Sequence, residues 1–141
     1  MLDAKLALET LLELTRALRG ERPLEEALGE VTRAAVRLLS ANHASLRLLD
    51  DSGEHLLAAV RSGAGSDRPA LSFRRGEGVL GWVVDHGEAV LLQDARHDAR
   101  FKRNPAKQGF VVGSLMVVPM LAAGRVFGAL SCSSDRTDAF S

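Results

Sequence analysis

The first stretch with recognisable chemistry is GEGVLGWV, residues Gly76–Val83, which spells the G-x-G-x-x-G pattern of phosphate-binding loops. Such a loop needs a buried strand before the glycines and a full helix after them. Here the preceding strand-like run is four residues long, Gly87 ends the helix that follows, and the sequence has no kinase motifs downstream. We therefore interpret the glycines as backbone-shaping residues: Gly76 and Gly78 allow positive φ, and Gly81 lets the helix lie close to the sheet.

A second group with possible chemistry is His97 between Asp94 and Asp98. One imidazole and two carboxylates could join a metal site or reach a haem. The same residue types in a polar loop are more commonly solvated caps, and we predict that Asp94 and Asp98 each cap a helical turn through a backbone N–H. The sequence therefore predicts no metal site and no cofactor.

Cys132 is the only cysteine, so the chain can form neither an internal disulfide nor a multi-cysteine zinc site. It could act as a redox sensor, but a small buried residue on a strand is the favoured interpretation. The nucleophile motif G-x-S-x-G is absent, and no local Ser, His and acid triple is suggested. We predict that the protein is not an enzyme and has no catalytic residues.

The segment from Asp94 to Lys107 has a local excess of positive charge. Against two acids it carries five basic residues, namely Arg96, Arg100, Lys102, Arg103 and Lys107. Such a patch can attract an anion even when the net charge is zero. A bound anion and simple pairing of Arg100 with Asp94 or Asp98 both remain open at this point.

Size and composition limit the other possibilities. The chain has 141 residues, with 46% hydrophobic residues and 18 basic residues balancing 18 acidic ones. One domain fits this length, and no global charge favours nucleic acid or a membrane. The amino terminus lacks a signal-peptide pattern, and no apolar run approaches the length of a membrane span. We expect a cytoplasmic protein, or a cytoplasmic piece of one.

The elements that must position these residues follow from hydrophobic periodicity. Apolar residues recur at spacings of three and four over 2–18 and again over 24–38, which predicts two amino-terminal helices. Period-two segments separated by turn residues predict strands. These expected strands are 44–50, 55–62, 70–73, 89–93, 114–121 and 125–133, with a short helix at 80–86. The strand at 115–121 is apolar on both parities and should be covered on both faces. The pattern indicates an α+β domain built on an antiparallel sheet of about six strands.

Several motifs in this order and spacing resemble the GAF domain family. They are GEGVLGWVV (76–84), HGEAV (86–90), D-x-x-x-D-x-R-F (94–101), SLMVVPM (114–120) and VFGAL (126–130), and the likeness covers about 24–133. The resemblance implies a sheet with terminal helices on one face and, on the other, a small-molecule pocket roofed by short helices and loops. In this family the glycine stretch begins the roof.

The resemblance also implies a function. GAF domains are regulatory modules that bind ligands or dimerise and seldom catalyse, so we expect a sensory domain of a larger signalling protein such as a histidine kinase or transcriptional regulator. Cyclic-nucleotide and bilin signatures are missing, and a single cysteine does not suit redox exchange of the free-methionine-sulfoxide reductase type. The alternatives are a ligand-free dimerisation module and, less favoured, such a reductase.

The expected ligand is small, partly apolar and anionic. Its predicted contacts lie in the roof and in the last two strands, namely Trp82, Val83, Asp94, Arg100, Phe101, Lys102, Ser114 and Met116. Trp82 can equally be a core anchor.

The expected organisation has two parts. Residues 1–22 form a helix whose stripe of Leu8, Leu11, Leu14 and Leu18 predicts a homodimer, with packing on the second helix as the alternative. Residues 23–141 form the GAF domain, cut before its carboxy-terminal helix, and the terminal helices pass the ligand state to an effector domain in the full-length chain.

Overall fold

A computed structural model of the chain describes residues 24–64, 73–101 and 112–140. The described elements, in chain order, are α2 (Leu24–Leu38), β1 (His43–Leu49), β2 (His55–Gly63), β3 (Phe73–Arg74), α3 (Gly78–His86), β4 (Val90–Leu92), the 3-10 helix η1 (Ala95–His97), β5 (Ser114–Ala122) and β6 (Arg125–Ser134). The predicted helix at 2–18 and the first part of the predicted strand at 70–73 lie outside the described residues.

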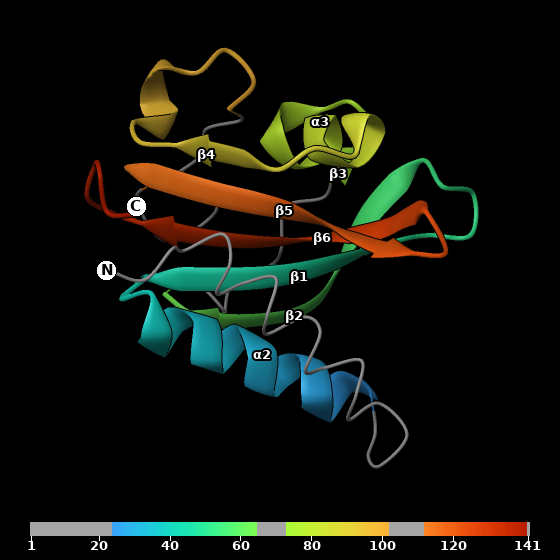
Figure 1. Cartoon of the computed structure of the whole chain (residues 1–141), viewed down its shortest axis with the longest axis horizontal. Helices are drawn as coiled ribbons and strands as arrows, with labels where there is room; N and C mark the ends of the chain where they lie inside the picture. The colour runs from blue at the N-terminus through green and yellow to red at the C-terminus, as the bar shows by residue number, and fades with distance from the viewer. Residues whose placement is uncertain (1–23, 65–72, 102–111, 141) are drawn as a thin grey trace.

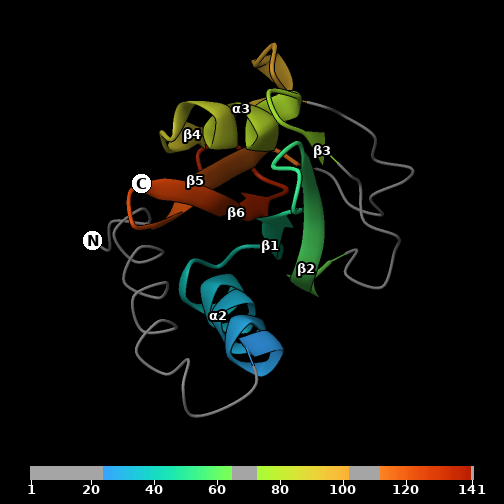
Figure 2. The same cartoon turned by 90° about the vertical axis from the view of Figure 1, so that its right-hand side faces the viewer.

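The strands form one antiparallel sheet in the order β3-β2-β1-β6-β5-β4, as the sequence predicted for fold class and strand number. β1 lies near the middle, with Ser45 opposite Arg61 of β2 on one side and opposite Ser131 of β6 on the other. The sheet curls between α2 on one face and α3 on the other (Figure 1, Figure 2). β1 and β6 therefore separate two distinct packing layers.

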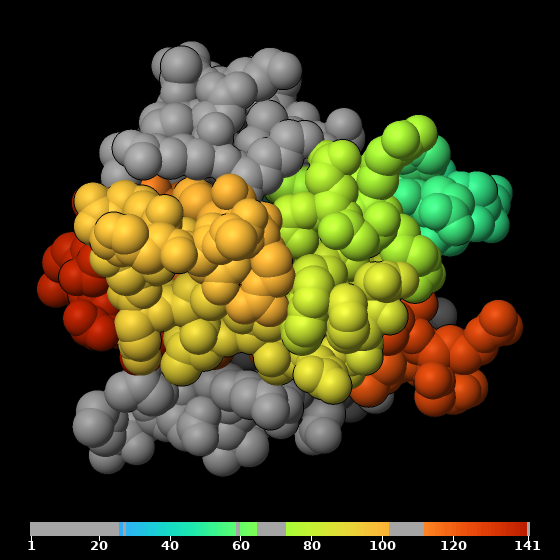
Figure 3. All heavy atoms as spheres, turned by 90° about the horizontal axis from the view of Figure 1, so that it is seen from above, coloured from blue at the N-terminus to red at the C-terminus, as the bar shows by residue number. Residues whose placement is uncertain are grey.

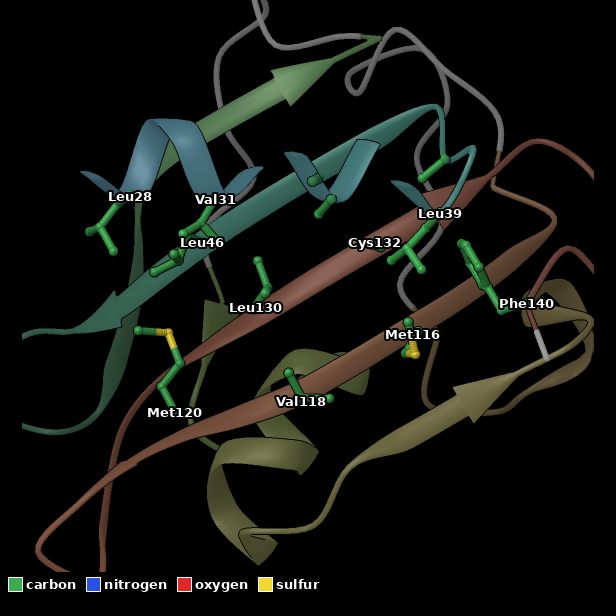
Figure 4. Packing of buried hydrophobic residues seen from close by; sticks show 13 residues of the cluster. Leu28, Val31, Leu39, Leu46, Met116, Val118, Met120, Leu130, Cys132 and Phe140 are labelled. Carbon is green, nitrogen blue, oxygen red and sulfur yellow. The ribbon is translucent and has the colours of Figure 1, made fainter. Parts of the chain in front are cut away.

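The face toward α2 holds the first hydrophobic core (Figure 4). Leu28, Val31 and Ala35 recur at helical spacing and point at the sheet, where they meet alternate residues of β1, β5 and β6 such as Leu46 and Leu130. Burial of each large side chain contributes about 1.5–3 kcal/mol, so this stripe fixes α2 on the sheet. In the described part of the chain, no helix combines the length and apolar character that crossing a bilayer requires.

The opposite face carries a second core beneath α3. Val79, Val83 and Val84 of the helix are almost completely buried against Val117 of β5 and Ala129 of β6. Because Met116, Val118 and Met120 belong to the α2 core while Leu115 and Val117 belong to the α3 core, β5 is covered on both faces, which confirms the prediction.

The glycine stretch shapes the turn that leads into α3. Gly76 and Gly78 have φ angles of +82° and +66°, which are in the left-handed region that favours glycine. A Cβ at Gly81 would overlap the carbonyl oxygen of Arg74, so only glycine allows α3 to approach β3 this closely. The interpretation of these glycines as backbone-shaping residues is confirmed, and α3 begins at Gly78 instead of Leu80.

Candidate functional site

A patch of polar side chains lies on the α3-facing side of the central strands. Arg47 marks this face, because its guanidinium lies over the ring of Phe73, 5.0 Å from the centroid, and Phe73 belongs to the α3 core. Alternation along β1 puts His43 and Ser45 on the same face, and their register partners there are Arg61, Ser131 and Ser133. We call these six residues the polar patch: His43, Ser45, Arg47, Arg61, Ser131 and Ser133.

The polar patch adjoins the apolar part of the same face. In β6, Ala129 packs in the α3 core, whereas Ser131 and Ser133 lie one and two side chains further along the same face. β1 changes in the same direction, from Leu49 beside the α3 core to Ser45 and His43. One face of the sheet therefore carries an apolar half under α3 and a polar half next to it.

The polar patch is largely removed from solvent. Ser45 is 1% exposed and Arg47 6% exposed, and His43, Ser131 and Ser133 are also buried. The Ser45 hydroxyl is buried and has no hydrogen-bond partner among the residues that the structure describes. Leaving such a group unsatisfied costs about 1–3 kcal/mol, so this hydroxyl marks a position where a ligand atom would be favourable.

Positive charge is concentrated at the polar patch. Burial, followed by the nearby charge of Arg61, lowers the pKa of Arg47 to about 10. Burial also lowers the pKa of His43, even though its Nδ1 lies 2.6 Å from the carbonyl oxygen of Ala64. That carbonyl can only accept, so Nδ1 carries the proton and donates. The His43 imidazole is therefore held neutral beside two guanidinium groups.

Two of the roof residues predicted from sequence, Trp82 on α3 and Arg100 in the segment after η1, form a separate cluster. The guanidinium of Arg100 lies 4.6 Å from the ring centroid of Trp82, which in turn stacks on the imidazole of His86. Arg100 also makes a two-pronged ion pair with Asp98, with nitrogen–oxygen distances of 2.9 and 2.8 Å. The hydrogen bond from Arg100 lowers the pKa of Asp98, and the same bond raises the pKa of Arg100. Arg100 thus has local partners, which is the simpler of the two alternatives left open by the sequence.

Asp94 does not cap η1 as predicted, because its carboxylate makes no side-chain cap hydrogen bond to the helix. It contacts His97 Nδ1 at 2.8 Å and Arg96 Nε at 3.3 Å instead. Burial raises the pKa of Asp94, but these hydrogen bonds outweigh it and lower the pKa overall. Asp98 does accept a backbone N–H, from Arg100 at 2.8 Å. Within the described ranges, no three or more His, Cys, Asp or Glu side chains are grouped to hold a metal ion.

The remaining predicted contacts are divided between the two faces. Val83 is buried in the α3 core and Phe101 packs against its edge. Met116 packs in the α2 core, on the other side of the sheet (Figure 4). The Ser114 hydroxyl donates to the carbonyl of Arg136 at 2.7 Å. Lys102 lies outside the described residues, and the structure does not bring Ser114 and Met116 to the roof cluster.

An open groove of about 860 Å³ lies at the other end of α3, and it contains none of the residues predicted as ligand contacts. It runs between the β1–β2 turn and the β5–β6 turn, which project at one end of the molecule (Figure 3). Its polar groups are largely satisfied within the protein: Asp50 contacts Ser52 and His55, and Arg75 donates to the Gly53 carbonyl. The polar patch, with its buried hydroxyl, is therefore the stronger candidate for a ligand site.

Sequence reasoning identified the strands of the polar patch but not the patch itself. The usable signal is the alternation of Ser45 and Arg47 with Leu46 and Leu48, which gives β1 one polar face. Nothing in that pattern says whether solvent or a roof covers the polar face.

A six-stranded antiparallel sheet with a helix on each face and a buried polar patch on the α3-facing side defines a small α+β domain. The sequence matches the profile of the GAF domain over residues 21–141, and the chain belongs to this family. Among curated proteins it is similar to the Nif-specific regulatory protein of Azospirillum lipoferum, with 27% identity over 131 residues, covering 91% of this chain and 21% of that protein. The chain spans only 15–25% of the length of the curated relatives it matches.

Solved structures with a similar fold include both regulatory and enzymatic proteins. One is the GAF domain of a phosphoenolpyruvate-protein phosphotransferase from Coxiella burnetii, with a TM-score of 0.78 and 23% identity, covering 93% of this chain and 79% of that one. Another is the free methionine-R-sulfoxide reductase of Neisseria meningitidis in complex with its substrate, with a TM-score of 0.77 and 21% identity, covering 98% and 78%. At these identities the likeness shows the fold, and this chain is a GAF domain similar to those of regulatory proteins.

Proposed function

We propose that this GAF domain is the sensory module of a larger cytoplasmic signalling protein and that it binds a small molecule at the polar patch. Ligand occupancy is passed through the terminal helices to an effector domain in the full-length chain, such as a histidine kinase or a transcriptional regulator. The similarity to a regulatory protein that is several times longer supports this placement.

The observation that carries the proposal is the buried hydroxyl of Ser45. Buried polar groups in native proteins are nearly always hydrogen-bonded, and exceptions commonly mark a ligand or water position. Ser45 faces Ser131 directly across the β1–β6 ladder and Arg61 across the β1–β2 ladder. A ligand placed there would meet hydroxyl and guanidinium groups on one side and the apolar half of the same face on the other, which is the usual composition of a small-molecule site.

A ligand-free dimerisation module is the second candidate. Its support is the tight packing beneath α3, where Val79, Val83 and Val84 are at most 2% exposed. The leucine stripe of residues 2–18, which would form the dimer, lies outside the described residues. We propose a homodimer in either case, and light scattering of the full chain beside a variant that begins at residue 23 tests it: the full chain should have twice its monomer mass and the shortened chain should not.

A reductase of the methionine-sulfoxide type is the third candidate, supported by the fold of the Neisseria meningitidis enzyme. Against it stands the chemistry of Cys132, which is the only thiol and is 0% exposed. Burial raises its pKa to about 12, so the nucleophilic thiolate is scarce at neutral pH. Redox exchange also needs a second thiol to resolve the oxidised one. We therefore propose that the domain binds its ligand without turning it over.

Native mass spectrometry of freshly purified protein tests the proposed function. We expect a retained small molecule, and a fraction of the protein that gains mass equal to it. The same molecule added back to stripped protein should raise the melting temperature, because binding to the native state stabilises it by RT ln(1 + [L]/Kd). Absence of any retained compound, together with a thermal-shift screen that finds no stabilising metabolite, would favour the dimerisation module.

A further inference from the structure

We propose that the polar patch selects an anionic ligand, with the guanidinium of Arg47 as its main ionic contact and the hydroxyl of Ser45 as a hydrogen-bond donor to the same anionic group. The inference rests on the proposed function, since it names the chemical class of the ligand at that site. The class is a small organic anion, with a carboxylate or phosphate at the polar patch and an apolar body against the neighbouring apolar half of the face.

The first step of the argument is the position of the two arginines. Arg61 lies opposite Ser45 on β2, and Arg47 lies two residues beyond Ser45 on β1, so the two guanidinium-bearing residues are diagonal neighbours on one face. Like charges at such positions repel. Arg47 is also 6% exposed, so its charge has little water around it. An anion placed between these residues would be attracted by both guanidinium groups.

The second step is the hydrogen-bonding capacity of the hydroxyls. Ser45 is buried next to Arg47 on β1, and the described residues offer its hydroxyl no partner. A hydroxyl can donate to an anionic oxygen, and hydrogen bonds to charged acceptors are stronger than neutral ones. Ser131 is the neighbour of Ser45 across the ladder and lies on the same face. Oxygen atoms of one carboxylate or phosphate group can therefore be met by hydroxyl and guanidinium donors together.

The third step is the apolar wall beside these donors. The Phe73 ring lies under the Arg47 guanidinium at 5.0 Å from the centroid, which is a cation–π contact. Ala129 faces Arg47 across the β1–β6 ladder and Leu56 follows on β2, and both belong to the α3 core. The apolar part of a ligand would continue from its anionic group along these side chains toward α3.

Arg100, the roof arginine predicted from sequence as a ligand contact, contributes less to the selection of an anion. Arg100 is held by a two-pronged ion pair with Asp98 and is stacked on Trp82. Its charge is therefore largely balanced by Asp98, and substitution of Arg100 should leave the charge preference of the polar patch in place.

The test compares matched anionic and neutral probes on full-length, ligand-stripped protein. Benzoate and phenyl phosphate are the anionic probes, benzamide is the neutral analogue of benzoate, and inorganic phosphate tests the charge without an apolar body. Affinities are measured by titration calorimetry or by amide chemical shifts in NMR spectra. We expect at least one organic anion to bind at least about tenfold more tightly than benzamide. Whichever of benzoate and phenyl phosphate binds more tightly identifies the preferred anionic group as a carboxylate or a phosphate.

Two variants test whether the anion binds at the polar patch. Arg47→Gln should weaken the preferred anion at least about tenfold and leave benzamide unchanged. Ser45→Ala should weaken the anion by about tenfold while keeping or raising the melting temperature of the free protein, because it removes a buried hydroxyl without a partner. This second variant keeps the test decisive if Arg47→Gln folds poorly. Arg125→Gln, on an exposed residue of the same strand as Ser131, is the matched control and should leave every affinity unchanged.

Three outcomes would overturn the inference. One is that neither benzoate nor phenyl phosphate binds more tightly than benzamide; another is anion binding that survives both Arg47→Gln and Ser45→Ala. The third is no saturable binding of any anion. The proposed function is judged separately: a neutral retained ligand that Ser45→Ala displaces would keep the sensory site and reject the anionic class, whereas no retained ligand and no binding of any probe would reject both.

Discussion

The guanidinium of Arg100 lies 4.6 Å from the indole ring centroid of Trp82 while two of its nitrogens bind the carboxylate of Asp98. The indole also stacks on His86, with the ring centroids 4.1 Å apart. Trp82 is the only tryptophan in the sequence, so the fluorescence of the protein reports on this one cluster.

Arg100→Ala should therefore change the tryptophan emission and lower the free energy of unfolding by about 1 kcal/mol, since a partly exposed cation–π contact and its ion pair are both lost. Emission spectra and urea titration measure the two effects. Arg96→Ala is the matched control, because it removes a nearby arginine whose contact is with the carboxylate of Asp94. Identical spectra for wild type and Arg100→Ala would contradict the stacking.

Two helical glycines should respond to alanine in opposite directions. In the middle of a helix, Gly→Ala gains about 0.5–1 kcal/mol from backbone entropy. At Gly29 of α2 the nearest atom to the added Cβ is the flexible end of Arg33 at 3.1 Å, so we expect Gly29→Ala to stabilise the protein.

At Gly81 of α3 the added Cβ would overlap two backbone atoms, the carbonyl oxygen of Arg74 and the nitrogen of Gly76. Backbone atoms cannot shift without disturbing the turn and β3. Gly81→Ala should lower the free energy of unfolding by about 1–3 kcal/mol despite its better helix propensity. Urea denaturation of the two variants in parallel decides the point. A gain at both positions would mean that α3 does not lie against β3 as described.

The sequence was informative where periodicity alone determines an element. Three-and-four spacing predicted α2, and apolar residues on both parities predicted that β5 is covered twice. The same both-sided pattern could not say which face Met116 occupies, and it lies in the α2 core. Asp94 was expected to cap a helix, but an arginine and a histidine within three residues compete for its carboxylate. A capping preference is a property of one residue type, whereas the neighbouring side chains determine which hydrogen-bond partner its carboxylate binds.

Cys132 should react slowly with thiol reagents in the native protein. It is 0% exposed on β6, which confirms the burial predicted from sequence. Burial raises its pKa to about 12, so both reagent access and the thiolate fraction are low. We expect labelling by a disulfide reagent to be roughly two orders of magnitude slower in buffer than in urea, since it requires opening of the core. A thiol introduced by Ser52→Cys in the exposed β1–β2 turn controls for reagent access. Equal rates for Cys132 in both solvents would reopen the redox-sensor interpretation.

His43 should make stability depend on pH below its ordinary pKa of 6.5. Burial lowers the pKa of the folded state, with Arg61 and Arg47 acting in the same direction. The unfolded chain then binds more protons than the native one as pH falls below 6.5, so the free energy of unfolding decreases down to the folded pKa. Above pH 6.5 both states are neutral at this residue and the effect is absent.

The pKa values of Asp50, Asp94 and Asp98 are also lowered, but their contributions are lost nearer the ordinary carboxyl value of 3.8 and below. The two windows are therefore separate. Urea titration between pH 7 and pH 5 should show a slope in wild type that His43→Gln reduces. An unchanged slope in the variant would assign the dependence to other groups.

Strand β6 carries the two layers of the molecule on successive residues. Ser131 and Ser133 belong to the polar patch, while Leu130 and Cys132 face α2, so a single backbone separates the proposed ligand from the α2 core. Phe140, which follows soon after β6, is buried in that same α2 core, and Gln93 of the roof side donates to its carbonyl. We therefore expect a small tilt of β6, caused by a ligand in the polar patch, to shift the residues on which α2 packs. Because the two layers share this backbone, communication across the sheet would need no chain of intermediate side chains.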